Sequence, residues 1–161
     1  EVPEVDCPRI LTGISRFAFF VNECIMEWVA DNMEFFMDSL PEDVCRAWEK
    51  RSGAVVFTTV DGNKIPNSIY ATCVGLYQNN RIVVADNYFC KTRENIRNGS
   101  TGAVLFITDT GNAYQVKGEI EYHEKGAFFD FMKEWNPEKH PGHAAAVIVP
   151  REVYSGAKKL K

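Results

Sequence analysis

The stretch from 114 to 123 alternates strictly between apolar and polar residues. In an extended chain successive side chains point to opposite faces, so this pattern predicts a β-strand with one buried and one solvated face, as antiparallel sheets have. Gly118 within the strand indicates a bulge or a close approach by another backbone or ligand. The apolar face is predicted to comprise Tyr114, Val116, Gly118, Ile120 and Tyr122.

Five further segments have the residues typical of strands: 54–60, 65–77, 81–85, 101–108 and 144–149. Asp61-Gly62-Asn63 and Gln78-Asn79-Asn80 separate three of them, and both runs are typical of tight turns. Short helices are expected at 92–98 and at 127–135, where an aromatic stripe predicts packing. We predict a mainly β fold with flanking helices, a six-stranded antiparallel β-barrel, because closure removes exposed sheet edges.

The first third of the chain has a helical pattern instead. Apolar residues between 14 and 29 recur at spacings of three and four, which predicts a helix. A second helix is predicted over 39–51, with Ser39 as its N-cap and Pro41 just inside. We therefore divide the chain into an N-terminal helical extension at 1–53, packed on the barrel, and a barrel domain at 54–161.

Composition narrows the class of protein. The 161 residues, 45% of them apolar, suffice for one domain with a sizeable core. A net charge of −4 argues against a nucleic-acid-binding protein. The apolar run at 17–21 is too short to cross a membrane. Five scattered cysteines favour reduced thiols in a cytoplasmic protein, and His140 and His143 lack further ligands for a metal site.

One candidate anion-binding segment follows the strand that ends at 85. Lys91, Thr92 and Arg93 stand where a loop leads into a predicted helix. Unpaired N–H groups at a helix start favour an anion, the two cations add positive charge, and the Thr92 hydroxyl can donate to a phosphate oxygen. The alternative interpretation is that Thr92 caps the helix and the charges form a solvated face.

A second candidate lies in the strand at 65–77. Asn67 and Ser68 are polar residues among apolar neighbours, and Pro66 is a residue that edge strands tolerate. Polar side chains on a barrel strand either bind a ligand or form hydrogen bonds within the core. The residues alone leave both interpretations open.

Together the two segments carry a resemblance that runs from about Ala54 to Val149. The sequence resembles the FMN-binding split-barrel family, relatives of pyridoxamine 5′-phosphate oxidase, and most closely its small stand-alone members. The resemblance rests on the order and spacing of a strand, an Asp-Gly turn, Pro66-Asn67-Ser68-Ile69, the strand at 80–85, Lys91-Thr92-Arg93-Glu94-Asn95 opening a helix, and the closing strand at 144–149.

The resemblance implies a six-stranded split barrel that binds FMN non-covalently at a homodimer interface. Main-chain groups of the second strand would contact the isoalloxazine, and Lys91 with Thr92 would hold the phosphate. A residue from the loop before the last strand of the second subunit, His140 or His143, would complete the site. The other implied contacts are Asn67, Ser68 and Ile69 on the strand and Ala85, Asp86, Asn87, Tyr88 and Cys90 beside the ring and ribityl chain.

The function implied is that of an FMN flavoprotein, an oxidoreductase or an electron-transfer protein with a redox partner or substrate that the sequence does not identify. The segment 154–161 lacks the Trp- and Arg-containing tail that shapes the substrate site of the oxidase itself. No catalytic acid or base is identified. The alternatives are a non-catalytic binding or sensor barrel for haem or another flavin-like ligand, and a ligand-free interaction scaffold.

Overall fold

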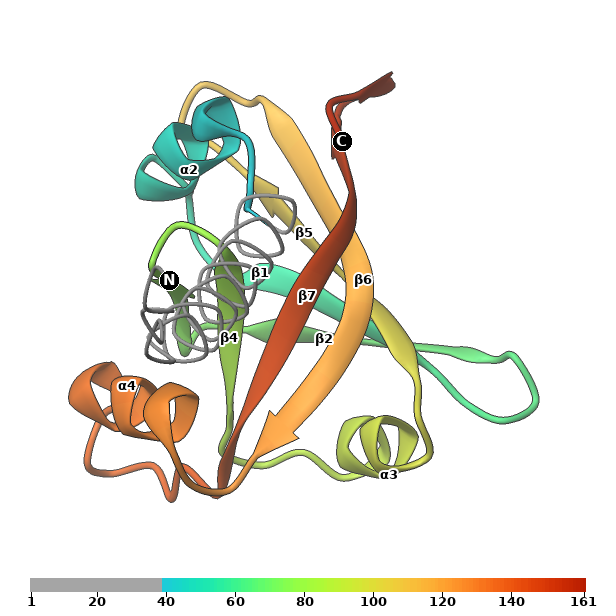
Figure 1. Ribbon diagram of the computed structural model, residues 1–161, viewed down its shortest axis with the longest axis vertical. Helices are drawn as coiled ribbons and strands as arrows, with labels where there is room; N and C mark the ends of the chain where they lie inside the picture. Colours follow the sequence, from blue (N-terminus) through green and yellow to red (C-terminus); the bar gives the residue numbers. More distant parts are fainter. Residues whose placement is uncertain (1–38) are drawn as a thin grey trace, which may run out of the picture. The chain divides into compact units, whose positions relative to one another are not determined.

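The computed structural model describes residues 39–161, which belong to one compact unit (Figure 1). Within this range three helices accompany eight strands. The helices are α2 (Glu42–Glu49), α3 (Lys91–Arg97) and α4 (Ala127–Trp135). The strands are β1 (Val55–Val60), β2 (Pro66–Ala71), β3 (Val74–Tyr77), β4 (Arg81–Asp86), β5 (Thr101–Ile107), β6 (Ala113–His123), β7 (Ala144–Ser155) and β8 (Lys158–Lys159).

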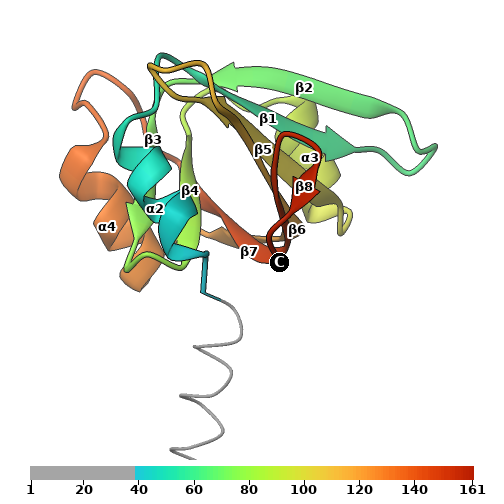
Figure 2. The ribbon, with the colours of Figure 1, turned by 90° about the horizontal axis from the view of Figure 1, so that it is seen from above.

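All strands pair antiparallel in one sheet, in the order β2-β1-β5-β6-β7-β4-β3, with β8 added to β7. The sheet curls so that β2 and β3, at its two edges, are joined by Thr72 and Cys73 alone (Figures 1 and 2). This confirms the split barrel. The predicted count of six strands is corrected to eight in this range, because 65–77 divides between the two edges and β8 is an additional short strand.

The β3–β4 hairpin confirms the turn predicted at 78–80. Gln78 and Asn79 have φ angles of 45° and 56°, and the Asn80 N–H donates to the Tyr77 carbonyl at 3.0 Å. Two consecutive residues with positive φ match the right-handed twist of the flanking strands. The residues with left-handed backbone are therefore Gln78 and Asn79, whereas Asn80 is buried immediately before β4.

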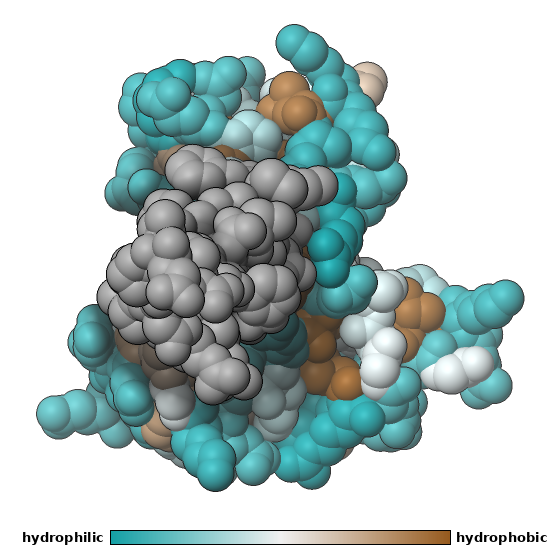
Figure 3. Space-filling view, in the orientation of Figure 1, coloured by the Kyte–Doolittle hydropathy of each residue, from teal (hydrophilic) through white to brown (hydrophobic). Residues whose placement is uncertain are grey.

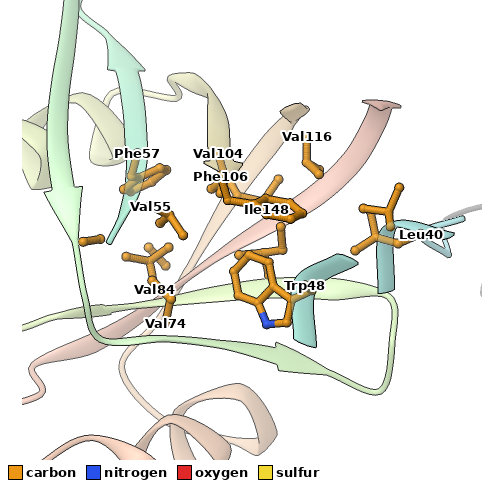
Figure 4. Close-up of a cluster of buried hydrophobic side chains, with 14 of the residues drawn as sticks. Leu40, Trp48, Val55, Phe57, Val74, Val84, Val104, Phe106, Val116 and Ile148 are labelled. Atoms are coloured by element: carbon orange, nitrogen blue, oxygen red, sulfur yellow. The ribbon is translucent and has the colours of Figure 1, made fainter. Parts of the chain in front are cut away.

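The core lies inside the curled sheet and is completed by α2 (Figure 4). Trp48 of α2 meets Phe106 of β5 edge to face, with ring centroids 5.2 Å apart. The helix begins at Glu42 with Pro41 at the N-cap position, so the predicted Ser39 cap is wrong. The helix predicted over 14–29 lies outside the described residues, and the domain division at residue 53 stays a prediction.

Helix α4 packs on the opposite side of the sheet, as its aromatic stripe predicts. Met132 is fully buried against Val83 and Val147, and Phe131 and Trp135 pack around it. Trp135 also lies close to Gly75 of β3, where the absence of a side chain makes room for the indole. The sheet therefore has a buried patch on its outer face as well as its inner one.

Gly118 confirms both features expected of it. The β6–β7 register shifts between Lys117 and Gly118, which marks a bulge. A Cβ at Gly118 would lie 1.8 Å from the carbonyl oxygen of Val149, so the strands approach too closely for any side chain.

We predict that Gly118→Ala destabilises the fold by about 3 kcal/mol, because the backbone of β7 must move to admit a methyl group. Urea unfolding measures this change. Gly62→Ala is the matched control, since Gly62 has nothing within 4 Å of an added Cβ and no positive φ. Equal stability of the two variants would contradict the close approach.

Candidate functional site

A cavity of about 280 Å³ opens where the end of β2, the link to β3, and the loop after β4 come together. The strand of the second candidate segment contributes to its wall, whereas Lys91, Thr92 and Arg93 of the first lie outside the lining. Five of the candidate contact residues line it: Ile69, Ala85, Asn87, Tyr88 and His140. The other lining residues are Tyr70, Ala71, Thr72, Cys73 and Phe89.

Beside this cavity, β2 and α3 are joined by a hydrogen bond between two predicted residues. Asn67 Nδ2 donates to Thr92 Oγ1 at 2.9 Å, and Thr92 is only 2% exposed. The buried Thr59 of β1 lies next to them and accepts a hydrogen bond from Asn95 at 3.0 Å. Asn67 thus forms hydrogen bonds within the protein, one of the two interpretations of its position.

Thr92 does not cap α3. The helix begins at Lys91, Cys90 occupies the N-cap position, and no side chain caps the helix. The Thr92 hydroxyl accepts from Asn67, and its own hydrogen has no acceptor among residues 39–161. A buried hydroxyl with an unused donor is suited to a ligand that supplies an acceptor.

Lys91 lies at the surface, with its side chain 46% exposed. Its Nζ is 3.3 Å from Glu94 Oε1 and 3.8 Å from Asp61 Oδ2. Contacts of this kind at a solvated position contribute little free energy, so the ammonium group can turn toward an anionic ligand.

Asn67 and Ser68 point to opposite faces of β2. The Ser68 hydroxyl lies 2.8 Å from that of Thr58 on the outer, exposed face of the sheet. Ile69 faces the same way as Asn67 and packs against the core. The main chain of β2 is itself available, because an edge strand paired only with β1 directs alternate N–H and C=O groups away from the sheet.

Asp86 is fully buried, and its carboxylate anchors the loop after β4. It accepts hydrogen bonds from Arg93 Nε at 2.6 Å, Arg93 Nη2 at 2.8 Å, the Tyr122 hydroxyl at 2.5 Å and the Phe89 N–H at 2.9 Å. Burial alone would raise the pKa of Asp86, but the hydrogen bonds from Arg93, Tyr122 and Phe89 together lower it below its ordinary value.

The same cluster shifts the partners of Asp86. Burial and the hydrogen bond to Asp86 raise the pKa of Tyr122 to about 12. The hydrogen bond to Asp86 also raises the pKa of Arg93. All three groups therefore keep their charge states at neutral pH, and the loop is held by a fixed ionic contact.

Asn87 anchors the loop at the next residue. Its Nδ2 donates to Asn136 Oδ1 at 2.9 Å, and its Oδ1 accepts from Asn136 Nδ2 at 3.1 Å and from the Gly142 N–H at 2.9 Å. This buried pair fastens the β4–α3 loop to the segment between α4 and β7. The Asn87 side chain contributes to the cavity wall while its polar atoms are satisfied within the protein.

Tyr88 follows these two anchors and turns outward, with 72% of it exposed. Its hydroxyl lies 3.2 Å from His140 Nδ1, and both side chains line the cavity. Of the two candidate histidines, His140 is the one at this cavity in the same chain. His143 is exposed and donates its main-chain N–H to the Asp86 carbonyl at 2.8 Å, and Cys90 is exposed outside the lining.

The comparison with known families can now be set beside this geometry. Residues 41–156 match the family model described as pyridoxamine 5′-phosphate oxidase. The chain belongs to that family. The match spans α2, all of β1 to β7 and the cavity described above. Among curated proteins, none matches the chain.

Solved structures of the pyridoxamine 5′-phosphate oxidase fold resemble this chain at low sequence identity. A putative pyridoxamine 5′-phosphate oxidase from Lactobacillus delbrueckii has a TM-score of 0.61 at 19% identity, covering 73% of this chain and 94% of its own. An FMN-binding protein from Syntrophomonas wolfei has 0.58 at 19%, covering 85% and 99%. HupZ of Group A Streptococcus has 0.57 at 22%, covering 64% and 84%. At these identities the likeness establishes the fold.

Two negative findings apply to residues 39–161. No helix in this range is long and apolar enough to cross a membrane. The same residues contain no group of three or more His, Cys, Asp or Glu side chains arranged to hold a metal ion.

Sequence reasoning missed three residues that fasten the loop after β4, namely Arg93 and Tyr122 as partners of Asp86 and Asn136 as the partner of Asn87. It also missed Thr59, which accepts a hydrogen bond from Asn95 of α3. The pairing of Asp86 with Arg93 could have been predicted, because Asp86 is an acidic residue at the end of an apolar strand and Arg93 follows seven residues later. Tyr122 and Asn136 are 36 and 49 residues from their partners, so no local pattern connects them.

We predict that Asp86→Asn costs about 3 kcal/mol of stability at pH 7, because Arg93 loses its buried partner. The pKa of Asp86 is lower in the folded than in the unfolded chain, so its contribution is full above about pH 4 and declines as the pH falls toward the folded-state pKa. Urea unfolding of both proteins from pH 7 to pH 3 should therefore show their difference narrowing in acid.

Glu124→Gln is the control for this comparison, since Glu124 pairs with Arg97 in an exposed contact. Its cost should stay within about 0.5 kcal/mol at every pH. A difference between wild type and Asp86→Asn that does not depend on pH would contradict the ionic role of Asp86.

Proposed function

We propose that this chain binds FMN non-covalently and acts as an oxidoreductase or electron-transfer protein, with the flavin at a homodimer interface. The observation that carries the proposal is the cavity between β2 and the β4–α3 loop, with the Asn67–Thr92 hydrogen bond beside it. The hydrogen bond between Asn67 and Thr92 links the two segments that resemble FMN-binding split barrels, which supports placing them in one site. Membership of the pyridoxamine 5′-phosphate oxidase family supports it.

The residues present fit an FMN phosphate. Thr92 has a hydroxyl hydrogen without an acceptor in the described part of the chain, and Lys91 carries an ammonium group held only by weak surface contacts. Asn67 orients the Thr92 hydroxyl by donating to its oxygen. The two residues would together donate to the phosphate oxygens, the task that charged and hydroxyl donors perform well.

The residues around the cavity would hold the ring. Ile69 and Ala85 provide apolar wall, and the main chain of edge strand β2 provides hydrogen-bonding groups near Asn67, Ser68 and Ile69. Tyr88, held from behind by Asp86 and Asn87, presents its ring to the ligand. FMN when bound supplies one- or two-electron chemistry, while the protein supplies position, electrostatics and protection from water.

A homodimer would close the cavity. Tyr70 lines it and is nevertheless 78% exposed, so the cavity opens onto the outer face of the sheet. On that face Tyr70 pairs with Val56 of β1, and Val56 pairs with Leu105 of β5. The exposed Tyr70 and Leu105 therefore flank the half-buried Val56 in an apolar row. A second copy of the chain would cover this row.

The first test is the absorption spectrum of the purified chain and the identity of any chromophore released by acid. We expect flavin bands and release of about one FMN per chain. A haem band in their place would favour the sensor alternative. A colourless protein that takes up neither FMN nor haem would leave the fold as an interaction scaffold.

The phosphate assignment predicts that Lys91→Gln and Thr92→Val each weaken FMN binding by about tenfold, the loss of one charge-assisted hydrogen bond. Titration of the chain with FMN, followed by flavin fluorescence, measures the Kd. Thr92→Ser should bind like wild type because it keeps the hydroxyl. Arg97→Gln is the control, because it removes the same charge at the far end of α3. If it weakened FMN binding as much as Lys91→Gln does, the phosphate assignment would be wrong.

The dimer assignment predicts that Leu105→Lys dissociates the homodimer and weakens FMN binding, because a charge is buried in the apolar row without a partner. Sedimentation equilibrium and FMN titration measure the two effects on the same sample. Ala127→Lys, which adds the same charge at an exposed position on α4, should change neither. A monomeric wild type that binds FMN tightly would contradict the interface.

A further inference from the structure

A second cavity, of about 400 Å³, lies away from the first and shares no residue with it. It is formed by α2, the β5–β6 turn and the C-terminal β7–β8 hairpin. Figure 1 shows α2 and the C-terminus at the upper end of the sheet and the loop from β4 to α3 at the lower end. The lining residues are Asp43, Arg46, Ala47, Lys50, Thr108, Thr110, Asn112, Tyr114, Ser155, Lys158 and Leu160.

Positive charge predominates in this cavity, although the chain as a whole carries a net charge of −4. Arg46, Lys50 and Lys158 face a single carboxylate, that of Asp43, and Asp43 is already paired with Arg46. Lys50 and Lys158 have no acidic partner among residues 39–161. Two ammonium groups without counterions at one cavity favour an anion there.

The neutral polar groups fall into two sets. Thr108, Thr110 and Asn112 hydrogen-bond to one another within the β5–β6 turn and offer little to a ligand. The hydroxyls of Tyr114 and Ser155 have no hydrogen-bond partner in the described part of the chain. Both hydroxyls can donate a hydrogen bond, as can the ammonium groups of Lys50 and Lys158. These four groups are therefore suited to a ligand rich in hydrogen-bond acceptors.

The remaining wall is apolar and firmly placed. The Tyr114 ring stacks on Phe106, with centroids 5.3 Å apart and planes at 16°, and Phe106 belongs to the buried core. Ala47 and Leu160 complete this surface. In the space-filling view, hydrophobic residues at the upper end lie between hydrophilic residues over α2 and over the C-terminal strand (Figure 3).

We propose that this cavity binds a small phosphomonoester with an apolar body, separately from the flavin cavity. The phosphate would lie between the Lys50 and Lys158 ammonium groups, with the Tyr114 and Ser155 hydroxyls as further donors. The apolar body would lie on the Tyr114 ring and Leu160. A dianion fits better than a single carboxylate, because one exposed ion pair contributes little and two cations with two hydroxyls act together on a phosphate.

The test is calorimetric titration of the full chain with phenyl phosphate, with and without saturating FMN. Phenyl phosphate should bind in both cases and more tightly than inorganic phosphate, which lacks the apolar body. Lys158→Gln and Lys50→Gln should each raise the Kd by about five- to tenfold, and Tyr114→Phe by about threefold with no change of charge.

Lys159→Gln is the matched control, because Lys159 neighbours Lys158 on β8 but lies outside the cavity lining, with its Nζ 2.9 Å from Glu152 Oε1. It should change the Kd by less than twofold. Equal losses for Lys158→Gln and Lys159→Gln would mean diffuse electrostatic attraction and overturn the site. Binding abolished by FMN or by Lys91→Gln would place the probe at the flavin cavity instead, and absence of binding would also overturn the proposal.

Discussion

The two-residue link between β2 and β3 is the constraint on which the rest of the structure depends. In a flat sheet the first and last of seven strands lie about 29 Å apart, at about 4.8 Å per strand. Three Cα–Cα steps from Ala71 to Val74 reach at most about 11 Å. The sheet must therefore curl until its edges nearly meet, and this curl encloses the core and creates the cavity at Thr72 and Cys73.

The end of β4 and the loop after it line that cavity and are fastened by buried hydrogen bonds. The side chains of Asp86 and Asn87 point inward. Asp86 forms hydrogen bonds with Arg93 and Tyr122, and Asn87 forms them with Asn136 and Gly142. Tyr88, the next residue, is left exposed at the cavity. A buried carboxylate is costly unless each lone pair is satisfied, so this arrangement has little freedom to shift. This support from within holds the exposed Tyr88 ring at the cavity.

Cationic groups in this acidic chain act in small local sets. Lys91 stands beside Thr92 at one end of the sheet, while Arg46, Lys50 and Lys158 gather at the other. At physiological ionic strength exposed charges are screened within about 8 Å, so each set influences only its own surroundings. The net charge of the whole chain therefore says little about either site.

The sequence by itself determined the strands with clear alternation, the hairpin turn at 78–80, the close approach at Gly118 and the family, because these depend on local periodicity, turn chemistry and motif order. Only the tertiary structure decided that 65–77 divides between two edges, that Asp86 and Asn87 point inward, and that His140 lines the cavity while His143 does not. It alone assembled the second cavity from α2, the β5–β6 turn and the C-terminal hairpin. These features depend on contacts between segments that are far apart in the sequence, and these contacts form only when the sheet curls. Local sequence patterns do not predict them.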